Sequence, residues 1–447
     1  MSRGVLGYKN RARIFWLGTS LLLVLLLVLS PACGVKSPSS PSVASPSPSP
    51  ASPLPAHSPT PSLSVAPASP TASPMTASPT QGIGLISTEV EPRFPRSISF
   101  RLKARSGALI SKAELEYVVD KISPAEVIVV VFPHFAPGKE IEASWLWDMR
   151  KASLPPGAKL KYRWKLWDLA GNRLTTGFKG FRFDDQRYKW QELEQGKVTL
   201  FWYQGDRNFA RELMSRAQET LRELAEDTGA ELKRSVEIWV YASAADLQRA
   251  MIFPEEWMGG AAFPKFGLVA IGISPANLAW GKRAIAHELT HLVIYQVTFN
   301  PYNDLPTWLN EGLAMHSEGE LRSDLKSALE QGISQDRLFS VRSLCSSFPA
   351  GTEEAKLCYA QSYSLVEFLL QRYGREKMLQ LLLTFKEGTT YDEALLKVYG
   401  LDLDGLDRLW RESLRSSQMA EAKGQPAEPV NLESKGLEPA LVNLGGF

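Results

Sequence analysis

Two histidines four residues apart, His287 and His291, are the strongest structural signal in this sequence. The stretch 280–297 has no proline, and no glycine after position 281, so it predicts a helix. Four residues of α-helix rise about 6 Å and make slightly more than one turn, so both imidazoles project from one face and can bind one metal ion. Glu288 lies beside them, where its carboxylate can accept a proton from metal-bound water.

The neighbours of this pair favour a metal site over a buried helix that merely carries two histidines. Ile285, Leu289 and Leu292 give the helix an apolar side, and Ala284 and Ile294 flank the histidines on the other side. The polar face is therefore not a solvated one. Buried neutral imidazoles need hydrogen-bonding or metal partners, and one metal ion is a partner that uses both rings.

A second helix is predicted after Pro306, and it carries the candidate third ligand, Glu311. Two histidines and one glutamate leave a fourth position open at zinc, as in catalytic sites. His316 is an alternative ligand on the same helix. A histidine one turn beyond a ligand more often lies beside the site or at the surface.

The motif H-E-L-T-H at 287–291, followed by W-L-N-E-G-L-A at 308–314, resembles the gluzincin branch of the zinc metallopeptidases. More narrowly, it resembles the bacterial peptidase MA-like metallohydrolases, over residues 197–414. The alternative metzincin pattern requires glycine at position 294 and histidine or aspartate at position 297, where this chain has Ile294 and Val297.

The resemblance implies a zincin-like fold, a zinc cofactor and the ligands His287, His291 and Glu311. It also implies that Glu288 is the general base of peptide hydrolysis. In zincin-like folds the strand that precedes the metal helix forms the sheet edge along the cleft, and we expect residues 267–273 in that place. A loop is predicted before this strand, because it contains Gly259, Gly260 and Pro264.

A helix predicted over 358–370 carries a candidate oxyanion donor, Tyr359. Gluzincins of the aminopeptidase type have a Tyr-x-Lys-Gly pattern at a similar helix, and Tyr359 falls on its tyrosine. This chain has Gln361 and Ser362 in place of the lysine and glycine. Tyr363, one turn later, is the alternative, and either tyrosine can equally be a packing residue.

The amino terminus predicts export. Basic residues precede an apolar run at 14–29, and Cys33 follows in a context that resembles a lipoprotein processing site, although Ser30 stands where leucine is usual. An uncleaved signal anchor is the alternative for residues 1–36. Both place the rest of the chain outside the cytoplasmic membrane and attached to it.

Residues 37–83 predict a disordered linker, because positions 37–80 hold 13 of the 30 prolines and no charged side chain. With 447 residues the chain is expected to contain more than one domain. Alternating apolar residues at 98–104 and 160–166 predict an all-β, immunoglobulin-like sandwich over 84–190. A zincin-like domain over 191–416 and a flexible tail over 417–447 complete an α+β chain.

The remaining cysteines, Cys345 and Cys358, predict a disulfide in an oxidising compartment. Zinc ligation by these thiols is the alternative, but two cysteines without a nearby histidine make a poor closed site.

The predicted function is an extracytoplasmic zinc peptidase that acts on a peptide or protein substrate, with a slight preference for endopeptidase action. The alternatives are a non-catalytic surface protein that uses the zincin domain as a scaffold, and metal-dependent hydrolysis of another bond. The formal net charge of +2, without a basic stripe with interleaved aromatic residues, gives no reason to expect a nucleic acid partner.

Overall fold

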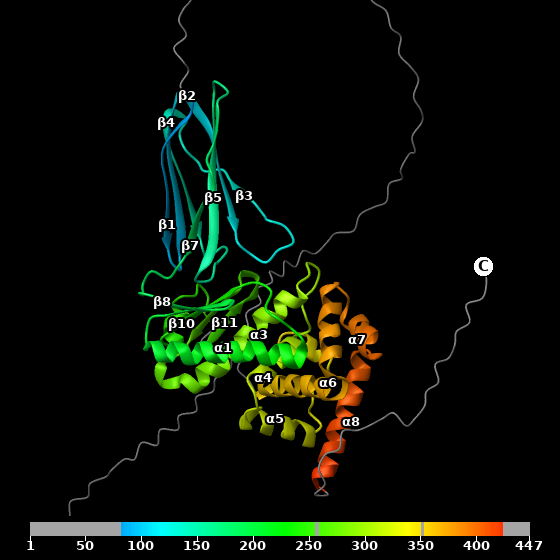
Figure 1. Cartoon of the computed structure of the whole chain (residues 1–447). Helices are drawn as coiled ribbons and strands as arrows, with labels where there is room; N and C mark the ends of the chain where they lie inside the picture. The colour runs from blue at the N-terminus through cyan, green and yellow to red at the C-terminus, as the bar shows by residue number, and fades with distance from the viewer. Residues whose placement is uncertain (1–81, 255–258, 350–352, 423–447) are drawn as a thin grey trace, which may run out of the picture.

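The computed structural model describes residues 82–254, 259–349 and 353–422, and within them an all-β domain precedes a mixed domain of sheet and helices (Figure 1). The β-domain contains β1 (Gly84–Arg93), β2 (Ser97–Val119), β3 (Val129–Val131), β4 (Gly138–Asp148), β5 (Ala158–Asp168), β6 (Arg173–Thr175) and β7 (Lys179–Phe183). The sheet of the mixed domain contains β8 (Gln191–Gln195), β9 (Val198–Trp202), β10 (Val236–Tyr241), β11 (Gly260–Phe263) and β12 (Leu268–Gly272).

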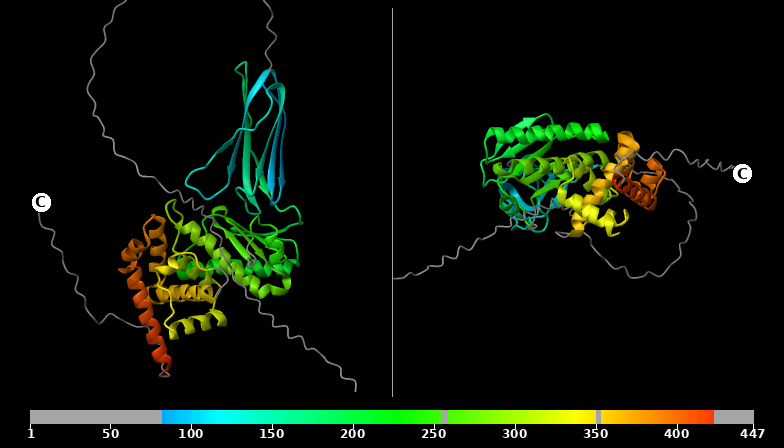
Figure 2. Two further views of the ribbon diagram at one scale, coloured as in Figure 1. Left: turned by 180° about the vertical axis from the view of Figure 1, so that it is seen from behind. Right: turned by 90° about the horizontal axis from the view of Figure 1, so that it is seen from below.

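Most residues of the mixed domain that lie outside its sheet are helical. The helices are α1 (Arg207–Thr228), α2 (Ala244–Gln248), α3 (Leu278–Thr298), α4 (Thr307–Ser317), α5 (Ser323–Ser334), α6 (Glu353–Lys386), α7 (Tyr391–Tyr399) and α8 (Leu403–Ala422), with short 3₁₀ turns η1 (Pro264–Phe266), η2 (Pro275–Asn277) and η3 (Ser343–Cys345). Figure 2 shows that α5 to α8 lie together at one end of the domain.

The β-domain is organised around β2, which is 23 residues long. Its first half pairs with β1 and β4, and its second half pairs with β5 and β3. Side chains from both halves meet in one core, where the ring of Phe100 lies 5.3 Å from that of Tyr162. The predicted alternation at 160–166 is present, because Leu160, Tyr162, Trp164 and Leu166 are all buried. The all-β character is thus observed, and the immunoglobulin-like class stays a prediction.

The sheet of the mixed domain has the strand order β11-β12-β10-β9-β8 among the described residues. β10 runs parallel to both β9 and β12, and its side chains alternate between two cores. Ile238 and Val240 face the core shared with α1 and α3, whereas Trp239 and Tyr241 face the opposite core. This period of two results from the pleat of a strand.

Helix α1 has a capping residue at each end. The side chain of Asp206 accepts a hydrogen bond from the Phe209 amide at 2.8 Å, which caps the helix. Gly229 ends it in the left-handed conformation with φ 72°.

The predicted edge of the sheet is wrong by one strand. Residues 260–263 form β11 instead of a loop, and β11 pairs antiparallel with β12 at the sheet edge. β12, predicted as the edge, lies inside the sheet between β11 and β10. The three residues between Gly259-Gly260 and Pro264 are too few to show alternation, so the sequence resembles a turn.

The predicted disulfide is also wrong, because both cysteines of the described region, Cys345 and Cys358, are free thiols. Cys345 ends η3 and its Sγ donates to the Val341 carbonyl oxygen at 3.5 Å. Cys358 lies on α6 and is buried in the main core of the mixed domain. Cys345 packs against the same core, so the two thiols share a core without being bonded to each other.

Within the described residues, no helix combines the length and the apolar character needed to cross a membrane. The predicted signal or anchor segment, Cys33 and the linker lie outside these residues.

Candidate metal centre

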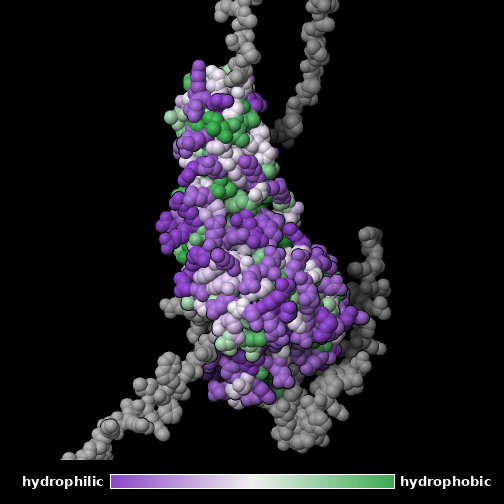
Figure 3. Space-filling view, turned by 60° about the vertical axis from the view of Figure 1, so that its left-hand side comes forward, coloured by the Kyte–Doolittle hydropathy of each residue, from purple (hydrophilic) through white to green (hydrophobic). Residues whose placement is uncertain are grey.

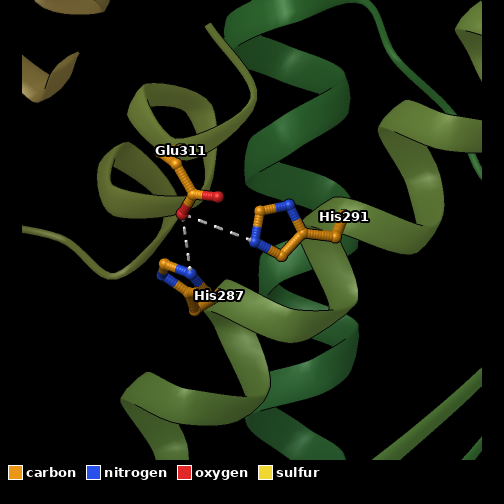
Figure 4. Close-up of side chains that lie close together, drawn as sticks. All are labelled: His287, His291 and Glu311. Atoms are coloured by element: carbon orange, nitrogen blue, oxygen red, sulfur yellow. Dashed lines mark ion pairs between the residues drawn. The ribbon is translucent and has the colours of Figure 1, made fainter. Parts of the chain in front are cut away.

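Two helices bring the predicted metal ligands together. His287 and His291 project from the middle of α3, and Glu311 projects toward them from α4 (Figure 4). Glu311 Oε2 lies 3.5 Å from His287 Nε2 and 3.9 Å from His291 Nε2. One ligand atom from each of the three residues lies within 4.8 Å of the other two, and all three side chains are buried.

The position of α4 depends on Gly312, the residue after Glu311. A Cβ atom at Gly312 would lie 2.3 Å from the Ser362 carbonyl oxygen of α6, so only glycine allows this close approach of α4 and α6. The glycine of the Asn-Glu-Gly sequence thus fixes the helix that presents Glu311.

Hydrogen bonds orient both imidazoles. His287 Nδ1 donates to Glu318 Oε1 at 2.8 Å, and His291 Nδ1 donates to Asn310 Oδ1 at 3.1 Å. Arg283 in turn contacts Glu318 Oε2 at 3.2 Å. Because Nδ1 of each ring is engaged in this way, Nε2, which faces Glu311, is the ring atom left to bind a metal ion.

Glu318 and Asn310 are site residues that the sequence interpretation missed. Asn310 is part of the Asn-Glu pair and could have been suggested by its place next to Glu311. Glu318 lies just beyond the end of α4, and no spacing rule connects it with His287, 31 residues earlier.

The three ligand atoms that have no hydrogen-bond partner fit a metal ion. Among the described residues, nothing hydrogen-bonds His287 Nε2, His291 Nε2 or Glu311 Oε2, although all three atoms are buried. Buried polar atoms without partners are costly, and here three of them converge on one point. Two imidazole nitrogens and one carboxylate oxygen are a ligand set that catalytic zinc sites use.

Glu288 is fully buried beside this point, and neither of its carboxylate oxygens has a hydrogen-bond partner within the described part of the chain. Burial raises its pKa to about 7, and the charges of Glu311 and Glu318 contribute to the increase while His287 opposes it. A Cβ atom on Gly260 of β11 would lie 2.8 Å from Glu288 Oε1. The sheet edge therefore passes directly beside the carboxylate of the predicted general base.

The two candidate tyrosines differ in their distance from the site. Tyr359 is buried on α6 against the ring of Phe348, and after burial the charges of Glu311 and Glu288 contribute most to raising its pKa. Tyr363 is half-buried, and the charges that raise its pKa are those of Glu367 and Glu320. Tyr359 is therefore the tyrosine that lies near the metal centre.

His316 lies apart from the ligand group and joins three helices instead. Its Nδ1 contacts Glu367 Oε1 of α6 at 2.5 Å, and its Nε2 contacts Asp227 Oδ2 of α1 at 3.0 Å. Burial alone would lower the pKa of His316, but the two carboxylates outweigh it and raise the pKa above the usual 6.5.

This bridge predicts a pH-dependent contribution to stability. A histidine whose pKa is raised on folding stabilises the native state fully below its unfolded pKa, and the contribution is lost as the pH rises through the folded pKa. We expect His316→Gln to lower the free energy of unfolding by roughly 1–2 kcal/mol at pH 6, and by less as the pH is raised to 9. Urea unfolding of both proteins across this range measures the difference, and a difference that grows with pH would contradict the prediction.

The hydrogen bond of Glu318 to His287 leads to a prediction about metal affinity. Replacing Glu318 by Gln keeps the shape but removes the charge that holds the His287 ring, so metal affinity should fall by about 10- to 100-fold. Competition with a chromophoric chelator measures the affinity. Glu320→Gln, two residues further along the chain, is the matched control, and an unchanged affinity in Glu318→Gln would remove Glu318 from the site.

A H-E-x-x-H helix that faces a buried glutamate of the next helix is typical of metallopeptidase-like proteins. In agreement, residues 216–416 match the family model of the peptidase MA superfamily, which supports a protease-like enzyme. No curated protein matches this chain.

Solved structures give weak likenesses. BhCBM56 is 10% identical over 21% of this chain and 88% of its own, with a TM-score of 0.16. The sporulation control protein Spo0M from Bacillus subtilis is 9% identical over 31% of this chain and 55% of its own, with a TM-score of 0.16. TM-scores this low support no argument about fold or function.

Proposed function

We propose that this protein is a zinc-dependent peptidase of the gluzincin type. The observation that carries the proposal is the convergence of three buried ligand atoms, from His287, His291 and Glu311, that have no hydrogen-bond partner among the described residues, with the Glu311 oxygen 3.5 and 3.9 Å from the two imidazole nitrogens. The match of residues 216–416 to the peptidase MA superfamily supports the same class of enzyme independently of the geometry.

The role of each residue in the proposed hydrolysis follows from its position at the metal centre. His287, His291 and Glu311 would hold the zinc ion, which when bound supplies Lewis acidity toward a water molecule and the substrate carbonyl. Glu288 takes a proton from the attacking water and passes it to the leaving amine, for which a pKa near 7 is well suited. Tyr359, with its hydroxyl kept neutral by a raised pKa, donates a hydrogen bond to the developing oxyanion.

The edge strand β11 is the proposed binding place of the substrate backbone. The Gly272 amide donates to the Gly259 carbonyl oxygen at 2.9 Å, so in this register residues 259, 261 and 263 turn their backbone groups toward β12. Gly260 and Ala262 therefore turn theirs toward the free edge. An extended peptide can add to this edge, and Gly260 would then place it beside Glu288.

We further propose that the enzyme works outside the cytoplasmic membrane. The basic and apolar amino terminus with Cys33 supports attachment to that membrane as a lipoprotein or by a signal anchor, and the proline-rich linker would separate the catalytic domain from it.

A digest of a peptide library tests the proposal. We expect the purified protein to contain about one zinc ion per chain and to cleave peptides. Treatment with a chelator should abolish cleavage, and added Zn²⁺ should restore it, with mass spectrometry identifying the products. A protein that holds zinc but cleaves no peptide would instead favour a scaffold without catalytic activity or hydrolysis of another bond.

A further inference from the structure

A cavity of about 440 Å³ lies at the junction of the β-domain and the mixed domain. The β-domain contributes Lys121 and Lys159 to its lining, and the mixed domain contributes Lys233, Glu237 and Phe266. Its volume is that of a site for a small molecule or a short segment of peptide, and such sites often lie between domains.

Positive charge dominates this cavity, which we name the basic cleft. Its lining has a net charge of +3, because it contains five cationic side chains and two carboxylates among the described residues. The cationic side chains are those of Lys121, Lys159, Lys197, Lys233 and Arg234, and the carboxylates are those of Asp120 and Glu237.

Both carboxylates of the basic cleft already have cationic partners. Lys159 Nζ lies 2.7 Å from Glu237 Oε1, and Arg234 Nη2 lies 3.5 Å from Asp120 Oδ1. Lys121 and Lys233 are exposed, and neither has a carboxylate within 4.0 Å in the described part of the chain. These two ammonium groups therefore remain available to an acidic ligand.

Lys121 lies beside η1, the turn that follows the edge strand. Its Nζ lies 5.1 Å from the ring centroid of Phe266, and the amide of the next residue, Ile122, donates to the Lys265 carbonyl oxygen at 2.7 Å. Phe266 and Lys265 belong to η1, which follows β11 directly. The basic cleft thus begins where β11 ends.

The direction of β11 connects the basic cleft with the metal centre. Gly260, beside Glu288, starts the strand, and Phe263 ends it, which corresponds to roughly 10 Å at about 3.3 Å per residue. A peptide added antiparallel, which is the more stable pairing per residue, runs in the opposite direction. Its residues on the amino-terminal side of the scissile bond therefore extend past Phe263 toward η1.

We propose that the basic cleft binds acidic side chains of a peptide substrate, about four or more residues to the amino-terminal side of the scissile bond. This inference rests on the proposed peptidase function. It assigns the β-domain a part in substrate selection through Lys121, and it makes Lys121 and Lys233 specificity-determining residues.

Peptides with one cleavable core test the inference. The core is extended by four glutamates on its amino-terminal side, by four glutamines there, or by four glutamates on its carboxyl-terminal side. With the full-length, zinc-loaded protein we expect kcat/KM for the amino-terminal glutamate peptide to exceed that for the glutamine peptide by about five- to tenfold, the size expected for two partly exposed ion pairs. The carboxyl-terminal glutamates should give no such gain, and 1 M NaCl should remove it.

The double variant Lys121→Gln/Lys233→Gln should reduce this ratio to about one and leave cleavage of the glutamine peptide unchanged. Lys139→Gln is the matched control, because Lys139 is an exposed lysine on β4 that does not line the basic cleft. A ratio near one in the wild-type protein, or an unchanged ratio in the double variant, would overturn the inference.

A binding measurement separates this inference from the proposed function. Fluorescence anisotropy of a labelled octaglutamate peptide reports binding whether or not any peptide is cleaved. If none of the test peptides is cleaved, the peptidase proposal fails. Octaglutamate binding that the double variant abolishes would still support an acidic ligand for the basic cleft, and equal or absent binding in both proteins would refute it.

Discussion

Replacing Glu288 by Gln is expected to lower kcat for peptide cleavage by about 10²–10⁴-fold, the usual contribution of a general acid–base group. The amide has nearly the same shape but cannot accept the proton of the attacking water. The side chain is fully buried with a raised pKa, so removing its charge should not destabilise the fold. Steady-state kinetics on a fluorogenic peptide measure kcat, and zinc analysis of the same samples measures the zinc content per chain.

Zinc content separates loss of the base from loss of the site. The Glu288→Gln protein should retain about one zinc ion per chain, because Glu288 is not among the three converging ligands. A variant that cleaves as fast as the parent protein would show that another group accepts the proton. If the variant is inactive and also contains no zinc, the loss of the metal ion accounts for the inactivity, and the role of Glu288 as general base loses its support.

Replacing His291 by Ala is expected to weaken zinc binding by about 10²–10³-fold. Zinc binding at four-ligand sites is worth about 10–16 kcal/mol in total, so an equal share is roughly 2.5–4 kcal/mol for each ligand. His291 Nε2 is one of the three converging atoms, and no other described side chain is placed to replace it. Competition with a chromophoric chelator measures the affinity.

His316→Ala is the matched control, because His316 also lies on a helix of this region but bonds to Glu367 and Asp227. It should retain zinc affinity within about twofold. Equal losses in the two variants would mean that either substitution disturbs the helices in general, and the ligand assignment of His291 would lose its support.

The helical spacing of His287 and His291 made the centre of this site predictable. Residues four apart on a helix share a face whatever the rest of the chain does, so the two imidazoles could be paired from the sequence. Glu311 was a candidate because it lies on the next predicted helix, and the resemblance of its Asn-Glu-Gly context to a known family supported it over His316. The partner of His287, Glu318, was not predictable, because its place depends on how α4 packs over α3.

The errors have similar causes. Gly260 and its neighbours resemble a turn, and only pairing with β12 makes them a strand. Pairing is a tertiary property, and it overrides the local preference of four residues. The disulfide between Cys345 and Cys358 was inferred from their separation in sequence and the expected compartment, neither of which fixes the distance and orientation of the two side chains.

Anomalous diffraction at the zinc absorption edge, from crystals of the purified protein, locates the bound metal ion itself. We expect one strong peak at roughly 2.0–2.2 Å from His287 Nε2, His291 Nε2 and an oxygen of Glu311. A peak elsewhere in the molecule, or no peak between these three side chains after incubation with Zn²⁺, would contradict the proposed zinc site.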